Sequence, residues 1–163
     1  MNGVIIYRSS YGSTKQYAQW ISEETGFPMF DNRDKAIPWG TDTVVIGCPV
    51  LANKAFLQGW MQKHWDKLSG KRVILFTTSG ADPSKQPVME WLEASLPEQI
   101  KQNTEIFPLA GSFDFSKLGF AHKLMMRIGA IVLRSDEIKL QIKNPVDNVR
   151  KENLTALLAA LNE

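Results

Sequence analysis

The stretch VIIYRSSYGSTKQYAQWI, residues 4–21, decides the fold. Its first part, Val4–Arg8, opens with four residues typical of a buried β-strand. Its last part begins a helix predicted over Thr14–Thr25, in which apolar side chains recur at helical spacing and which Gly26 ends. Between them lies a short loop of Ser and Thr residues around Gly12. A strand, a hydroxyl-rich loop and a helix in this order indicate the beginning of a β-α-β unit.

The same alternation continues along the chain. Thr43–Gly47 (TVVIG) is apolar throughout, as expected for a strand covered on both faces. Glu105–Ala110 contains Pro108, which favours an edge strand or a bulge. The pattern predicts an α/β fold in one domain over residues 1–163, with a doubly wound five-stranded parallel sheet in the order 2-1-3-4-5 and helices on both faces. The other predicted elements are strands at Pro28–Phe30 and Arg72–Thr77 and helices at Ala52–Leu68, Val88–Leu96 and Asn148–Leu161.

The composition is that of an ordinary globular protein. Of the 163 residues, 44% are hydrophobic and 22% are charged. The one cysteine, Cys48, excludes an internal disulfide and fits a reducing compartment. Met1–Gly3 leads straight into the first strand, and no apolar run approaches the ~20 residues that span a bilayer, so we expect a cytoplasmic protein without a signal peptide. A formal net charge of +2 argues against nucleic-acid binding.

The loop after the first strand is suited to an anion. A helix N-terminus offers free N–H groups and the positive end of the helix dipole, and the hydroxyl groups add further donors. Neither G-x-x-x-x-G-K-[ST] nor G-x-G-x-x-G occurs, which argues against a magnesium–nucleotide loop and a dinucleotide fingerprint. We therefore expect one terminal phosphate, bound without a metal ion by Ser9, Ser10, Tyr11, Gly12, Ser13 and Thr14. The alternative is a Ser/Thr-rich helix cap that binds no ligand.

The S-x-x-G-x-T pattern at residues 9–14 resembles the FMN phosphate loop of flavodoxins. The resemblance implies FMN as cofactor and implies that the loops after the third and fourth strands hold the isoalloxazine ring. These loops lie where ligands bind in open α/β sheets, at the carboxyl ends of the strands. The ring-binding positions implied in this way are Pro49, Val50, Leu51, Ala52 and Asn53 in one loop and Thr78, Ser79, Gly80 and Ala81 in the other.

The two ring loops contain no aromatic residue if Phe56 belongs to the following helix, as the pattern predicts. Flavodoxins that carry electrons often hold the flavin between aromatic side chains. An uncovered flavin face favours an enzyme, because a substrate can stack on it, although Trp39 or another distant aromatic residue could cover the ring instead. Cys48 is expected to be a small buried residue and His64 a packed one, and no acid–base catalyst is assigned.

A basic, apolar segment follows the fifth strand and is predicted to be a helical insertion at about residues 116–135. Residues 117–134 contain four Lys or Arg and no acid, so the rest of the chain has a net charge of −2. Lys123 and Arg127 share a helix face, with His122 beside them. Such a helix can lie on an anionic membrane surface, or cover a flavin pocket and offer cations to a substrate carboxylate. It can also simply pack on the sheet edge with a solvated basic face.

This arrangement of a flavodoxin-like domain and a basic helix resembles the menaquinone-dependent protoporphyrinogen dehydrogenase group. The resemblance implies an FMN oxidoreductase that passes electrons from a porphyrinogen-like substrate to a quinone, at the inner face of the membrane. Lys123, Arg127 and Arg134 are then candidate partners of the substrate's propionates.

Two other functions were weighed. An electron-transfer flavodoxin that serves a protein partner is the first alternative, although such carriers are usually strongly acidic. A domain that binds no cofactor and only scaffolds a partner is the second. A phosphoacceptor receiver domain is excluded, because Arg8-Ser9 and Gly47-Cys48-Pro49 stand where its acidic residues are required.

Overall fold

The computed structural model describes the chain except residues 1, 52–53, 81–82, 85, 133 and 135. Five parallel strands form the central sheet in the order β2-β1-β3-β5-β6, and the short β4 pairs antiparallel with the end of β3. This is the predicted 2-1-3-4-5 order once β4 is set aside, and the predicted fold class is confirmed. The strands are β1 (Gly3–Tyr7), β2 (Met29–Asp31), β3 (Thr43–Leu51), β4 (Lys54–Ala55), β5 (Arg72–Ser79) and β6 (Thr104–Ala110).

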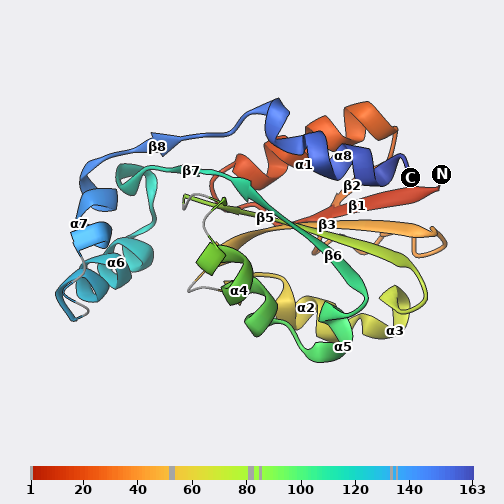
Figure 1. Ribbon diagram of the computed structural model, residues 1–163, viewed down its shortest axis with the longest axis horizontal. Coiled ribbons are helices and arrows are strands. Elements are labelled where there is room, and N and C mark those ends of the chain that lie inside the picture. Colours follow the sequence, from red (N-terminus) through yellow and green to blue (C-terminus); the bar gives the residue numbers. More distant parts are fainter. Residues whose placement is uncertain (1, 52–53, 81–82, 85, 133, 135) are drawn as a thin grey trace.

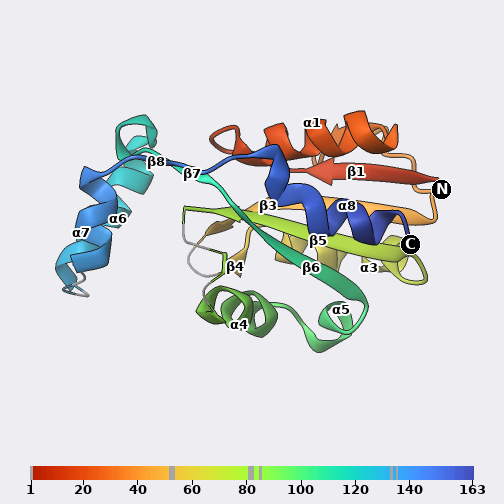
Figure 2. The same ribbon diagram turned by 45° about the horizontal axis from the view of Figure 1, so that its top comes forward.

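Helices cover both faces of the sheet (Figures 1 and 2). One face carries α1 (Ser13–Thr25) and α8 (Thr155–Leu161), and their side chains pack on Ile5, Val45 and Ile74. The other face is packed through Val4, Val44 and the strand residues whose side chains point the same way as these two. Its helices are α2 (Gln58–Lys63), α3 (Trp65–Leu68), α4 (Gln86–Ser95) and α5 (Glu98–Lys101). Because adjacent strand residues point to opposite faces and both faces are covered, the central strands contain continuous apolar runs, Val44–Ile46 in β3 and Val73–Phe76 in β5.

The edge position of β6 agrees with its proline. β6 is the last strand in the order, so one side of it has no strand partner in the described sheet. Pro108 pairs in register with Thr77 of β5. A residue without a backbone N–H is tolerated where a strand has only one neighbour.

The predicted helix over Ala52–Leu68 is wrong in its first part. β3 continues past Gly47 to Leu51, and the chain then returns as β4, with Val50 opposite Ala55. Helix begins only at Gln58. The apolar pattern is nevertheless real, because Leu57 and Met61 are fully buried in the core. The predicted packing of His64 is confirmed, since its ring stacks on those of Trp39 and Trp60, with centroids 5.8 and 4.5 Å away.

The basic segment forms a helical hairpin that projects from the end of the sheet where the strands finish (Figure 1). It contains a 3-10 turn at Phe115–Lys117, α6 (Phe120–Val132) and α7 (Asp136–Lys143). Its base is the two-stranded pairing of β7 (Ser112–Phe113) with β8 (Val146–Asp147). The helical segment extends beyond the insertion predicted at about residues 116–135, because residues 136–143 are helical as well. The closing helix also begins later than predicted, since a 3-10 turn at Lys151–Leu154 precedes α8.

Candidate functional site

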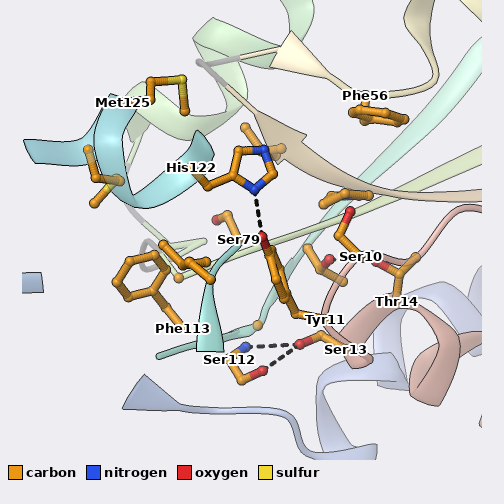
Figure 3. A pocket seen from close by; sticks show the side chains of 17 residues that line it. Ser10, Tyr11, Ser13, Thr14, Phe56, Ser79, Ser112, Phe113, His122 and Met125 are labelled. Atoms are coloured by element: carbon orange, nitrogen blue, oxygen red, sulfur yellow. Dashed lines mark hydrogen bonds between the residues drawn. The ribbon is translucent and has the colours of Figure 1, made fainter. Parts of the chain in front are cut away.

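A pocket lies at the carboxyl ends of the strands, between the sheet and α6 (Figure 3). Five separate parts of the chain contribute to it: the loop before α1, the end of β3 with the turn after β4, the end of β5, the segment around β7, and α6. The lining residues are Ser10, Tyr11, Ser13, Thr14, Pro49, Val50, Phe56, Thr78, Ser79, Gly80, Gly111, Ser112, Phe113, Leu118, His122, Met125 and Met126.

The loop before α1 leaves the start of that helix open to an anion. Gly12 stands at the N-cap with φ of 100°, a backbone conformation that other residues rarely adopt. No side chain caps the helix there. The Ser9 hydroxyl oxygen accepts a hydrogen bond from the N–H of Gly12 itself, at 3.1 Å. The N–H groups of the first turn are therefore not capped by a side chain, which suits a phosphate.

Two hydroxyl pairs connect this loop to the rest of the pocket. The hydroxyl oxygens of Thr14 and Thr78 lie 2.8 Å apart, and both residues are buried. The Ser13 hydroxyl lies 2.7 Å from that of Ser112 and also accepts the Ser112 N–H at 3.1 Å. Sequence reasoning assigned both loop hydroxyls to phosphate alone. In the structure they also fix the loop against the end of β5, through Thr78, and against β7, through Ser112.

The structure brings most of the predicted ring-binding residues to the same pocket. Pro49 and Val50 line it from β3, and Thr78, Ser79 and Gly80 line it from the end of β5. The backbone of Leu51 ends β3, next to these residues. The predicted residues Ala52, Asn53 and Ala81 lie outside the described residues. Ser9 belongs to the loop but is not among the described lining residues.

The expectation that the ring loops contain no aromatic side chain is wrong, because it placed Phe56 in a helix. Phe56 lies in the turn after β4 rather than in a helix, and its side chain is 44% exposed at the pocket. Tyr11 and Phe113 line the pocket from two further segments (Figure 3). Trp39 is not among the described lining residues. Its ring instead stacks on those of Trp60, in α2, and His64, which follows α2. Tyr11 was visible in the loop sequence, but its role as a wall depends on the tertiary structure.

His122 is a site residue that sequence reasoning did not assign. Its Nδ1 lies 2.5 Å from the Tyr11 hydroxyl oxygen, and the two side chains point toward one another across the pocket (Figure 3). Met125 and Met126 line the same wall from the next turn of α6. This contact links residues 111 positions apart in the chain. The only signal in the sequence was a histidine beside two cations on an apolar helix.

Lys123 and Arg127 lie on another side of α6 and are not among the described lining residues. The Lys123 ammonium donates to the Ser116 carbonyl at 2.7 Å, and the Arg127 guanidinium lies 5.6 Å from the centroid of the Phe115 ring. Both cations therefore stabilise the junction between the 3-10 turn and α6. Their assignment to a substrate stays a prediction.

Cys48 is buried beneath the pocket floor, next to Pro49. Burial raises the pKa of its thiol to about 12, partly offset by the backbone N–H groups of Leu57 and Phe56. The thiolate is the reactive form of cysteine, so this residue is suited to packing and not to redox chemistry.

We expect Cys48 to resist iodoacetamide in the folded protein near neutral pH and to react once urea unfolds the chain. The folded pKa lies above the value of about 8.5 for an unfolded thiol, so this group's contribution to stability declines as pH rises from about 8.5 toward 12. Mass spectrometry measures the alkylation. The free energy of unfolding, measured with urea, should fall less between neutral and alkaline pH for Cys48→Ala than for the wild type. Rapid modification of the folded protein would contradict the assignment.

Within the part of the chain that the structure describes, no group of three or more His, Cys, Asp or Glu is placed to hold a metal ion. A search of the same residues finds no helix with the length and apolar character needed to cross a bilayer.

The chain belongs to the flavodoxin domain family, whose model matches residues 4–132. Among solved structures it is similar to a Bacteroides eggerthii DSM 20697 protein assigned as a flavoprotein, at 17% identity and a TM-score of 0.52, covering 66% of this chain and 85% of that one. It is also similar to a flavoprotein from Lactobacillus acidophilus NCFM in complex with FMN, at 16% identity and a TM-score of 0.51, covering 67% and 91%. At these identities the likeness shows the fold. No curated protein sequence matches the chain.

FMN is the cofactor that the family supports, and the residues of the pocket fit it. A helix start without a side-chain cap stands at one end, with the hydroxyl groups of Ser10 and Thr14 beside it. Apolar and aromatic side chains such as Val50 and Phe113 form the rest of the wall. Thus the donors suit a phosphate at one end, and the apolar surfaces suit a flat ring at the other.

Proposed function

We propose that this protein is an FMN-dependent oxidoreductase that passes electrons between a small, reduced, porphyrinogen-like substrate and a quinone. The observation that carries the proposal is the shape of one pocket, which joins an open helix N-terminus to an apolar, aromatic wall closed by α6. Membership of the flavodoxin domain family and the FMN-bound structural neighbour support the redox class. The choice of a porphyrinogen-like substrate and a quinone is supported by the basic α6 segment and by the resemblance of the sequence to the menaquinone-dependent protoporphyrinogen dehydrogenase group.

Each part of the pocket has its own task in this proposal. FMN supplies the electron-transfer chemistry when bound. The loop residues 9–14 hold its phosphate, and the ends of β3 and β5 contact its ring through Pro49, Val50 and Thr78–Gly80. Leu118 and Met126 of the α6 wall exclude water from the ring. His122 offers a polar group at this otherwise apolar wall, oriented by its hydrogen bond with Tyr11.

An electron-transfer flavodoxin remains the second candidate, and one observation favours it. Tyr11 and Phe56 line the pocket and are each nearly half exposed, so aromatic side chains are available to cover a flavin. The α6 helix favours the enzyme instead, because it adds a wall with a histidine to the pocket. The near-neutral charge of +2 also favours the enzyme over an acidic carrier.

The first test is a visible absorbance titration of the purified protein with FMN and, separately, with riboflavin. Saturable FMN binding with a shifted flavin spectrum, and much weaker riboflavin binding, are expected because riboflavin lacks the phosphate. The bound FMN is then reduced with dithionite, and its reoxidation by a quinone is compared with its reoxidation by a one-electron protein acceptor. Binding of neither flavin would overturn the proposal and leave a scaffold domain.

A further inference from the structure

The helical hairpin formed by α6 and α7 carries a large apolar surface that no described part of the chain covers. Phe120 is 82% exposed and Ile131 is 75% exposed, although both are large apolar residues. The hairpin stands apart from the sheet and its covering helices (Figures 1 and 2). Among the described residues of the hairpin, the exposed large apolar side chains also include Leu124, Met125, Ile128, Val132 and Leu140. So large a group of exposed apolar side chains marks an interaction surface.

The exposed apolar residues gather on one side of α6. Phe120, Leu124, Ile128 and Ile131 follow each other at intervals of four, four and three, which places them along one stripe of a helix. His122 belongs to a different side, the one that lines the pocket. The helix therefore has one side that closes the pocket and another that faces outward.

The hairpin is also the most basic part of the chain. Residues 117–143 contain six Lys or Arg and two acids, a balance of +4, so the remainder of a chain with net charge +2 carries −2. Arg127 and Arg134 are exposed on it. No acid occurs from residue 117 to residue 134, so the cations beside the apolar stripe stand against no acid of α6. Lys117 and Lys139 pair with Asp114 and Asp136, at 3.6 and 3.0 Å, and the excess of cations remains beside the stripe. An apolar stripe flanked by an excess of cations is complementary to a surface that is apolar inside and anionic outside.

We propose that the α6–α7 hairpin docks on an anionic lipid bilayer, with the stripe of Phe120, Leu124, Ile128 and Ile131 inserted at the interface. Charge complementarity selects lipid over a second copy of this chain, because two copies would bring their basic segments together. The proposal goes beyond the redox function, since lipid binding requires neither flavin nor substrate. It also places the α6 wall of the pocket beside the membrane, within reach of an apolar quinone dissolved there.

The test is sedimentation of the full chain with vesicles, with and without FMN. Wild-type protein should sediment with vesicles that contain equal amounts of phosphatidylcholine and phosphatidylglycerol and should largely stay in solution with phosphatidylcholine alone. Phe120→Glu combined with Ile131→Glu should weaken binding at least tenfold. Arg127→Gln combined with Arg134→Gln should weaken binding to the anionic vesicles only. The matched control is Trp91→Glu, which places a charge at an exposed aromatic residue on α4, outside the hairpin, and should bind as the wild type does.

Circular dichroism confirms that each variant is folded before it is compared. Wild-type protein that stays in solution with anionic vesicles overturns the proposal. So does a concentration-dependent dimer that the Phe120→Glu and Ile131→Glu pair abolishes, if vesicle binding is absent, because the stripe would then be an interface between copies. Vesicle binding by a chain that binds no FMN would sustain the membrane proposal while the redox proposal fails.

Discussion

Gly47→Ala is expected to lower the free energy of unfolding by about 3 kcal/mol, the upper end of the usual cost of overpacking a core. Gly47 pairs with Phe76 in the central parallel register, and a Cβ atom at Gly47 would lie 2.1 Å from the Phe76 ring. The ring cannot swing away easily, because Phe76 is fully buried between the sheet and α1. Urea unfolding followed by circular dichroism measures the loss.

Two further variants test whether the loss of stability comes from the clash between a Cβ atom at residue 47 and the Phe76 ring. Gly59→Ala is the matched control: Gly59 lies in α2 with open space at its Cβ position, so this change should be neutral or stabilise by up to about 1 kcal/mol. Phe76→Leu in the Gly47→Ala background should recover part of the lost stability, because a smaller side chain admits the new methyl group. If Gly47→Ala is as harmless as Gly59→Ala, the close approach of the ring to the strand is not present in solution.

Ser10→Ala combined with Thr14→Val is expected to weaken FMN binding more than tenfold and to leave riboflavin binding nearly unchanged. Both hydroxyl groups line the pocket beside the open start of α1. Each hydrogen bond from a hydroxyl to a charged phosphate contributes about 1.5–3 kcal/mol, whereas riboflavin has no phosphate to lose. Fluorescence or absorbance titrations with the two flavins measure the difference.

The variant Thr78→Val tests whether the Thr14 hydroxyl contributes by binding the phosphate directly or only by holding the loop in position. The Thr14 hydroxyl lies 2.8 Å from that of Thr78, so Thr78→Val removes its protein partner while both loop hydroxyls stay available to phosphate. A smaller loss of FMN affinity than in the double variant is expected. Equal losses for FMN and riboflavin in the double variant would mean that the substitutions disturb the ring site or the fold, and would contradict a phosphate site at residues 9–14.

Much of the sheet could be predicted because its determinants are local. The central strands are short apolar runs, since both faces of a parallel sheet are covered, and Pro108 indicated the edge position of β6. The hydroxyl loop before α1 could also be predicted, since a strand, a loop and a helix that are consecutive in sequence must meet there. Strand ends were less certain: β3 runs four residues beyond the predicted end at Gly47.

The helix predicted over Ala52–Leu68 shows where periodicity misleads. Lys54–Ala55 instead form a short strand that is stabilised by pairing with β3, and Phe56 and Leu57 lie in the turn that follows it. Apolar residues such as Ala55 and Leu57 are buried in the same core whether the backbone is extended or helical. Because Phe56 was assigned to a helix, the sequence analysis did not identify it as a residue that lines the pocket.

The sequence by itself determined the alternation of buried strands and helices, the hydroxyl-rich loop at the start of α1 and the basic, apolar character of residues 117–134. These properties depend on neighbouring residues, through hydrogen bonding, side-chain period and charge. Only the tertiary structure decided that α6 closes the pocket, that His122 meets Tyr11, and that the stripe through Phe120 and Ile131 is left uncovered. Such contacts join segments about a hundred residues apart, so they depend on how the finished sheet positions its loops and not on any local pattern.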